Sequence, residues 1–402
     1  MAGEWSAIKL GDFVSLQRGH DLPDENRRQG KVPVLGSFGI TGWHDEARAH
    51  GPGVTIGRSG ASIGVVNYCA VDFWPLNTAL YVIDFHGNNP RFAYYFLRRF
   101  DFATFNSGSA QPSLNRNFIH PIEVRVPPRL EQDRIAELLT ALDDKIELNR
   151  RTAQTLEAMA RALFKSWFVD FDPIHAKAAG RPTALTDELS ALFPDSFYEG
   201  GLPAGWSMHP ARTVVDNVIT RVQPSIDSAE KAYLPIDAIR PRVLTDVDVR
   251  PGSEAQSSLV SFQSDDILFG AMRPYFHKVC LAPFEGTTRT TVFVLRPRQP
   301  DDLAFCLLVM SEDSTIEFAT SSSSGSTIPY AVWDGTLAEM SIVVPPPSLR
   351  IALNKAALPL LRRAQSASRQ SRTLAEFGDT LLPKLISGEL RIADAEKRIA
   401  AA

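Results

Sequence analysis

The sequence predicts an α+β fold in which one pattern is used twice: a globular mixed α/β domain followed by a long helix. Two observations carry this prediction. About forty residues recur at a fixed offset without a gap. Both copies also repeat apolar residues every seven positions, which is typical of helices packed along one another. We therefore expect the two helices to pair as an antiparallel coiled coil, with pseudo-twofold symmetry between the halves.

The composition is that of an ordinary globular protein. Of the 402 residues, 44% are hydrophobic and 22% charged, so each half can bury a core of its own. There is no apolar run of about 18 residues, which argues against a membrane span. The three cysteines, Cys69, Cys280 and Cys306, match no metal spacing and suit a reducing compartment. We expect a cytoplasmic protein without membrane contact.

The repeat begins at a Val-Pro-Pro motif. This motif stands at 126–128 and recurs at 344–346, and at the same offset Thr-Leu at 155–156 recurs at 373–374. The proline pair ends a preceding strand, since proline can neither continue a strand ladder nor sit inside a helix without cost. Each copy therefore predicts a strand end followed by a long helix, the first from about Leu130 to Phe168.

The seven-residue seam is apolar except for one asparagine. Asn149 is either a buried polar residue that sets the register of the helix pair or a solvated position near the helix middle. Pro359 falls inside the second copy, so we expect the second helix to be kinked or broken and the first to be straight. The seam residues are Ile135, Leu142, Asn149, Leu156 and Leu163 in the first copy and Leu353, Leu360, Ala367, Leu374 and Leu381 in the second.

The globular part of each half is rich in strand patterns and has a Gly/Ser loop near its end, at 107–112 and 324–329. A stretch rich in Pro, Gly and Ala separates the halves. The predicted segments are a first domain at 1–127, a first spacer helix at 128–172, a linker at 173–205, a second domain at 206–345, and a kinked second spacer helix with the C-terminal tail at 346–402.

No standard active site is visible. The Gly-rich stretch 57–64 fits neither a dinucleotide fingerprint nor a phosphate loop, and the histidines have no metal-ligand spacing. The segment 88–91 approaches the Asn-Pro-Pro-aromatic motif of amino-methyltransferases but lacks the second proline and the aromatic residue. We expect no catalytic residue, no metal and no cofactor in this chain.

The helical motifs carry a resemblance to a known family. The stretch 126–172, with Val-Pro-Pro-Arg-Leu-Glu-Gln at its start and Leu-Phe-Lys-Ser-Trp-Phe-Val-Asp-Phe-Asp at its end, strongly resembles the first helical conserved region of specificity subunits of type I restriction-modification enzymes. The stretch 380–390 is similar to their second region, and 266–275 resembles part of their target recognition domains. One departure is Leu-Arg at 349–350 where the first copy has Glu-Gln, which predicts an unequal grip of the two halves on partner subunits.

The resemblance implies a non-catalytic DNA sequence-specificity subunit. Each target recognition domain would read one half of a split site in double-stranded DNA, and the helices would set the gap and dock two modification subunits. Those subunits would use S-adenosylmethionine to methylate adenine, and restriction subunits that need ATP and Mg²⁺ would join for cleavage. The alternatives are a coiled-coil scaffold that binds only protein and a DNA-acting enzyme with an unrecognised active site.

Candidate DNA-reading residues are polar side chains on loops that could reach a groove. The net charge of −4 does not itself indicate a nucleic-acid binder, so the local arrangement of charges must supply the affinity. A structural role is at least an equal alternative for each candidate. The candidates are Arg58, Ser59, Ser109, Gln111, Asn115 and Arg116 in the first domain and Arg273, Tyr275, His277, Lys278, Ser326, Thr327 and Tyr330 in the second.

Overall fold

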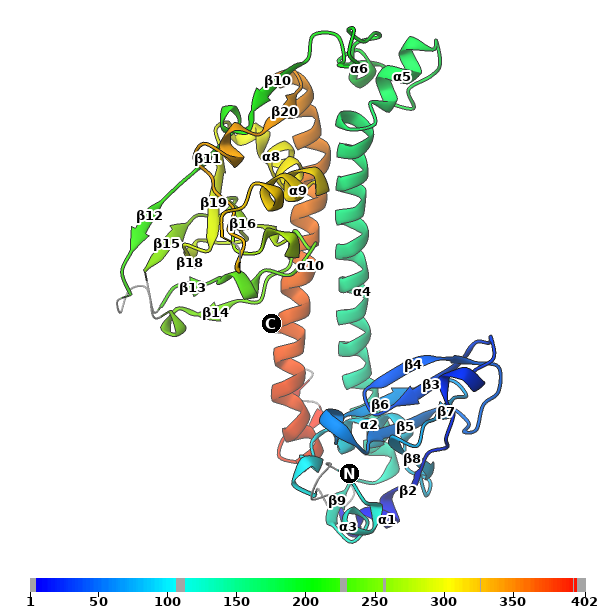
Figure 1. Cartoon of the computed structure of the whole chain (residues 1–402). Helices are drawn as coiled ribbons and strands as arrows, with labels where there is room; N and C mark the ends of the chain where they lie inside the picture. Colours follow the sequence, from blue (N-terminus) through cyan, green and yellow to red (C-terminus); the bar gives the residue numbers. More distant parts are fainter. Residues whose placement is uncertain are drawn as a thin grey trace. The chain divides into compact units, whose positions relative to one another are not determined.

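The computed structural model describes residues 5–105, 113–224, 230–255, 258–325, 327–392 and 394–395. The chain forms two compact units (Figure 1). Unit 1 consists of Met1–Ile146 and Thr373–Ala402, and unit 2 consists of Glu147–Arg372. Each unit therefore contains one globular domain together with part of each long helix.

The globular domain of unit 1 is built on a four-stranded antiparallel sheet in the order β2-β8-β5-β6. A three-stranded sheet, β4-β3-β7, and a two-stranded sheet, β1-β9, complete it. The strands are β1 (Ser6–Lys9), β2 (Ser15–Arg18), β3 (Val32–Gly36), β4 (Gly39–His44), β5 (Gly53–Gly57), β6 (Val66–Cys69), β7 (Trp74–Pro75), β8 (Ala79–Asp84) and β9 (Glu123–Val126). The short helices are α1 (Leu10–Phe13), α2 (Pro90–Arg98) and α3 (Arg116–Ile119).

Helix α2 covers the sheet with an aromatic face. The Asn89 side chain caps its first turn by accepting hydrogen bonds from the N–H groups of Arg91 (2.8 Å) and Phe92 (3.0 Å). Phe96 is fully buried, with its ring centroid 4.8 Å from that of Phe13. The same core takes in residues from both long helices, Ile135, Leu139, Leu142, Leu381, Leu385 and Ile386.

The globular domain of unit 2 repeats this frame. Its four-stranded sheet has the order β11-β19-β16-β17, and a two-stranded sheet pairs β10 with β20, as β1 pairs with β9. The second sheet differs, because it has five strands in the order β12-β15-β18-β13-β14. The strands are β10 (Ser207–Pro210), β11 (Val215–Asn217), β12 (Thr220–Val222), β13 (Ala232–Tyr233), β14 (Arg250–Pro251), β15 (Leu259–Phe262), β16 (Ile267–Gly270), β17 (Val279–Leu281), β18 (Gly286–Arg289), β19 (Val292–Pro297) and β20 (Ser341–Val344).

Unit 2 also holds the segment between the halves. Helix α8 follows the last strand of the main sheet, as α2 does in unit 1, and all eight of its residues are buried. The remaining helices are α5 (Asp172–Ala178), α6 (Asp187–Ser190), α8 (Leu303–Met310) and α9 (Asp313–Ser321).

The two long helices are α4 (Arg129–Phe168, 40 residues) and α10 (Pro347–Ser387, 41 residues). Within unit 2, Asn149 of α4 donates from Nδ2 to the Gln370 side-chain oxygen (2.9 Å), and Ala153 packs with Ala364 and Ala367. Residue numbers rise along α4 as they fall along α10, so the predicted antiparallel pairing is confirmed. Asn149 is 5% exposed, which makes it a buried polar residue of the seam and not a solvated one.

The structure corrects the expectation that Pro359 breaks the second helix. Helix α10 runs from Pro347 to Ser387 without interruption (Figure 1). Pro359 is exposed, whereas Ala357 and Leu361 on either side are fully buried in the core of unit 2. Burial of these two neighbours keeps the chain helical, although Pro359 cannot donate one main-chain hydrogen bond. A bend at this position stays a prediction.

Each long helix is fastened at its start to the domain before it. Gln132 of α4 is buried; its Nε2 donates to Asn88 Oδ1 (2.7 Å) and to the Pro127 carbonyl (2.9 Å). Arg350 stands at the equivalent position of α10; its Nε donates to Asp302 Oδ1 (2.8 Å) and its Nη1 to the Pro345 carbonyl (2.8 Å). Glutamine and arginine therefore make the same attachment by different chemistry.

The described helices include none long and apolar enough to cross a membrane. Cys69, Cys280 and Cys306 are buried free thiols. Across the part of the chain that the structure describes, no group of three His, Cys, Asp or Glu side chains is placed to hold a metal ion.

Candidate nucleic-acid interface

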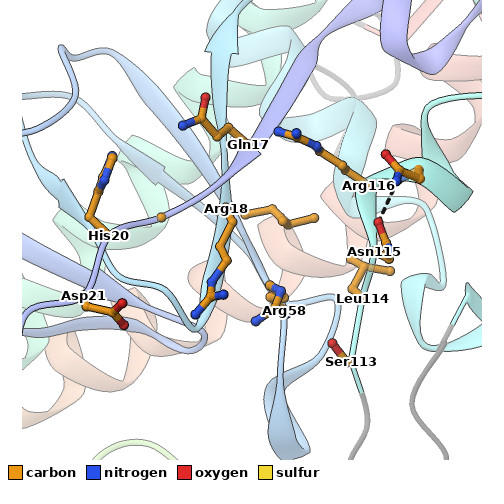
Figure 2. A pocket seen from close by; sticks show the side chains of 12 residues that line it. Gln17, Arg18, His20, Asp21, Arg58, Ser113, Leu114, Asn115 and Arg116 are labelled. Carbon is orange, nitrogen blue, oxygen red and sulfur yellow. Dashed lines mark hydrogen bonds between the residues drawn. The ribbon is translucent and has the colours of Figure 1, made fainter.

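A groove of about 800 Å³ opens in the first domain where two strands end and a third begins (Figure 2). Arg18, the last residue of β2, pairs with Leu80 of β8, and Gly57, the last residue of β5, pairs with Ala79. Because the strands are antiparallel, the ends of β2 and β5 lie on either side of the start of β8. Arg18 and Arg58 therefore reach the same groove from the two strands that flank β8.

The other wall of the groove is the segment that follows the Gly/Ser loop. Leu114 donates its N–H to the Arg58 carbonyl (2.8 Å), and Ser113 forms a β-bridge with Ser59. Asn115 caps α3 by accepting from the Asn117 N–H (3.0 Å), the dashed line in Figure 2. The structure thus brings four candidates together, Arg58, Ser59, Asn115 and Arg116, while Ser109 and Gln111 lie outside the described residues.

The groove is rich in hydrogen-bond donors. Three arginines line it, Arg18, Arg58 and Arg116, against one carboxylate, Asp21. Arg58 Nη1 donates to the Asn77 carbonyl at 3.4 Å. A guanidinium carries five N–H donors, so one main-chain bond positions the group and leaves the others for a ligand. Such a surface suits phosphate oxygens and the acceptor edges of bases.

Helix α3 is held against β2 by two hydrogen bonds at Leu16. The Leu16 N–H donates to His120 Nε2 (3.1 Å), and the Leu16 carbonyl accepts from Arg116 Nη1 (3.2 Å). Nε2 can accept only while the ring is neutral. Burial lowers the pKa of His120, and the nearby charge of Arg116 lowers it further. The neutral ring therefore keeps α3 and its arginine in place beside the groove.

The sequence-based search missed several groove residues. Most of them lie at the end of β2 or directly after it, where no local motif marks them, and only the order of strands in the sheet brings these beside Arg58. The missed residues are Gln17, Arg18, His20, Asp21 and Asn117.

In the second domain the end of β16 takes the place of the end of β5. Met272 bridges to Tyr330, and Arg273 donates its N–H to the Pro329 carbonyl (2.8 Å), just as Ser59 pairs with Ser113. Tyr330 is half-buried and donates its hydroxyl to the Thr290 carbonyl (2.6 Å). Tyr275 is 49% exposed and Thr327 is exposed, while Ser326 lies outside the described residues.

Two candidates in this domain support the turn instead of facing solvent. His277 is 3% exposed, and its Nε2 lies 2.8 Å from the Ser311 carbonyl. Lys278 donates from Nζ to the Ile236 carbonyl (2.8 Å). Burial lowers the pKa of both side chains. His277 and Lys278 therefore both make structural contacts, and their role in reading DNA stays a prediction.

The seam candidates divide between the two units. In unit 1 Ile135, Leu142 and Leu381 are buried and Leu374 is half-buried in the core. In unit 2 Asn149, Leu353 and Ala367 are buried, and Leu156, Leu163 and Leu360 are half-buried.

Comparisons with known proteins agree with this architecture. A family model described as the type I restriction modification DNA specificity domain matches residues 2–158. The type I restriction enzyme HindI specificity subunit of Haemophilus influenzae is 24% identical over 328 residues, which cover 69% of this chain and 71% of that protein. The MjaIX specificity subunit of Methanocaldococcus jannaschii is 25% identical over 309 residues, or 72% of this chain and 65% of that protein.

A solved structure extends the likeness to the whole fold. The S subunit of a type I restriction-modification system from M. genitalium aligns with a TM-score of 0.65 at 15% identity, covering 95% of this chain and 96% of that one. The repeated frame, the paired long helices and the sequence matches thus point the same way. Residues 2–158 thus match the specificity domain of type I restriction-modification systems, and the chain is similar in sequence and in fold to specificity subunits of such systems.

Proposed function

We propose that the chain reads a split site in double-stranded DNA, with one target recognition domain for each half. The observation that carries this proposal is one sheet frame used twice with different chemistry at the same strand ends. Strand β5 is followed by Arg58, whereas β16 is followed by Ala271. Strand β2 ends on Arg18, whereas β11 ends on Asn217. Two domains that read different half-sites need such a difference.

The first-domain groove suits direct reading of bases together with phosphate contact. Arginine pairs with the guanine O6 and N7 acceptors, and glutamine or asparagine pairs with adenine. Gln17, Arg58 and Asn115 offer these groups from three separate segments. Arg18 and Arg116 add charge that draws the phosphate backbone. For this domain we retain Arg58, Ser59, Asn115 and Arg116 as DNA-reading residues.

The partners follow from the same proposal. The helices α4 and α10, within spacer segments at 128–172 and 346–402, dock two modification subunits, and restriction subunits join for cleavage. The family has no cofactor of its own, so S-adenosylmethionine, ATP and Mg²⁺ belong to these partners, in the cytoplasm. At ~1.5 Å per residue, a helix of 40 residues is about 60 Å long. We propose that this length sets the gap between half-sites.

The decisive experiment maps adenine methylation. The full chain is co-expressed with its modification subunits, and methylated adenines are sequenced with and without the chain. We expect a two-part motif that disappears without the chain and loses discrimination in one half with Arg58→Ala. If the same motif is methylated with and without the chain, the result would favour a scaffold that binds only protein. Methylation or cutting of DNA by the purified chain alone would favour an enzyme.

The spacer role has its own test. One heptad is inserted in α4 after Leu148 and a matching heptad in α10 beside Gln370, the residue that bonds Asn149. The gap in the mapped motif should lengthen while both half-sites keep their sequences. A change in either half-site would contradict the division of labour between domains and helices.

A further inference from the structure

The first domain presents one aromatic side chain almost fully to solvent. Phe38 stands at the turn between β3 and β4 and is 77% exposed, the most exposed large hydrophobic side chain among the described residues. Ile40 (59%) and Trp43 (54%) follow it along β4. Apolar groups gathered on one exposed hairpin mark a surface that binds something.

The hairpin tip is packed against the strand that leads into the groove. A β-carbon added at Gly57 would come within 2.5 Å of the Ser37 carbonyl oxygen, so only glycine allows this approach. A β-carbon at Gly39 would lie 3.3 Å from Asn67 Oδ1 of β6. The tip thus rests on the end of β5, next to Arg58. Ser37, the residue before Phe38, therefore contacts the strand end that leads directly into Arg58 of the groove.

The second domain has exposed aromatics at the equivalent strand end. After β16 the chain makes a tight turn at 274–276, where Tyr275 is 49% exposed and Phe276 is 45% exposed. The flanking residues Arg273 (φ 51°) and His277 (φ 54°) both adopt the left-handed conformation, which costs free energy in residues other than glycine. Buried His277 holds this strained turn through the Ser311 carbonyl. A strained turn that displays two aromatic rings is consistent with selection for what the rings contact.

We infer that each target recognition domain carries an aromatic wedge that inserts into the base stack of its half-site: Phe38 in the first domain and Tyr275 with Phe276 in the second. This inference rests on the proposed function. Apolar side chains of this kind insert between base steps and unstack them, and enzymes that modify a base must take it out of the stack. In the first domain the strand end that Ser37 contacts leads into Arg58 of the arginine-lined groove, and these arginines attract phosphate, so the occupant of this surface is DNA and not an apolar protein face.

The test uses the full chain with its modification subunits and a duplex carrying the mapped site. 2-Aminopurine is placed beside the methylated adenine of one half-site or the other, and its fluorescence reports unstacking. The variants are Phe38→Ala and the double variant Tyr275→Ala/Phe276→Ala. The control is Ile83→Ala, a 52% exposed apolar residue near the opposite end of β8. Phe38→Trp should retain function.

Each wedge variant should lose about ten- to hundredfold in affinity for the specific duplex, the range for removing one or two stacked aromatics. Affinity for a duplex without the site and assembly with the modification subunits should stay unchanged. Each variant should abolish the fluorescence rise in one half-site only. Unchanged affinity and fluorescence would overturn the wedge, and so would loss of subunit assembly, which would identify a protein contact. If the wild-type complex shows no two-part site, the proposed function itself fails.

Discussion

The two target recognition domains are attached to their long helices by different interactions. In unit 1 Gln132 joins α4 to the start of α2 by neutral hydrogen bonds, and Asn89 caps α2 from within the domain. In unit 2 Arg350 joins α10 to Asp302 by a buried ion pair. There the α8 N-terminus is capped from the spacer helix, since Ala304 donates its N–H to Asn354 (3.0 Å).

This difference shows that the repeat preserves the place of an attachment and not its residues. Gln132 and Arg350 both bond a carbonyl of the preceding Pro-Pro motif and both reach the helix that covers the main sheet. From the sequence, Arg350 in place of Gln predicts that the two halves bind partner subunits unequally, and this stays a prediction. Within the chain, both residues maintain the grip on their own domain.

Breaking the ion pair should have the largest effect. Arg350 and Asp302 have side chains 12% and 4% exposed, so Arg350→Ala leaves a buried carboxylate without its partner. Such a loss costs about 3–5 kcal/mol. Urea unfolding, followed by hydrogen exchange of unit 2 amides, should report this destabilisation. The double variant Asp302→Asn/Arg350→Gln, which imitates unit 1, should recover most of it.

The matched variant in unit 1 is Gln132→Ala. It should cost less, about 1–3 kcal/mol, because it leaves neutral groups unpaired and no buried charge. Equal losses for Gln132→Ala and Arg350→Ala would show that charge is irrelevant to the comparison.

A second difference between the units lies at Glu157, which has no carboxylate counterpart. Its buried side chain accepts hydrogen bonds from the main-chain N–H groups of Leu244 (3.0 Å) and Thr245 (3.0 Å), whereas the matching residue of α10 is Ala375. Glu157→Ala should cost about 2–3 kcal/mol, since hydrogen bonds to charged groups are stronger than neutral ones. Hydrogen exchange at the amides of Leu244 and Thr245 should accelerate. Glu157→Gln, which keeps one acceptor oxygen, should accelerate it less; unchanged exchange in Glu157→Ala would refute the anchor.

The smallest expected effect depends on pH and is confined to unit 1. The pKa of His120 lies below its ordinary value of 6.5, so the unfolded chain takes up a proton at a higher pH than the folded chain. Stability should therefore be full above about pH 6.5 and decline as the pH falls below it. Loss of the Leu16 hydrogen bond is worth about 0.5–1.5 kcal/mol. His120→Gln, which keeps an acceptor but does not titrate, should flatten this decline. If the variant and the wild type show the same dependence of stability on pH, the proposed role of neutral His120 is wrong.

The helices were predictable from sequence because their packing imposes a period on the chain. The seam residues repeat every seven positions, and that period indicated both the length and the antiparallel pairing of α4 and α10. Pro359 misled the prediction, because the local cost of proline was outweighed by burial of its neighbours Ala357 and Leu361.

The candidate site was predictable only where it is local. Arg58 and Ser59 stood out as a polar turn, but Arg18 joins them only through the strand order β2-β8-β5, which no local pattern reveals. His277 shows the opposite case. A polar residue after a strand resembles a surface loop in sequence, while the fold turns its ring inward to Ser311. Sheet order and side-chain direction are long-range properties that one sequence does not state.

The first domain does not contain all of its own core. Leu381, Leu385 and Ile386, at the far end of the chain, are buried among Ile135, Leu139 and the aromatic residues of α2. During synthesis the first domain leaves the ribosome long before these residues are made. The first half of a nascent chain therefore leaves an apolar strip exposed until α10 is made, and α10 then completes the domain that emerged first.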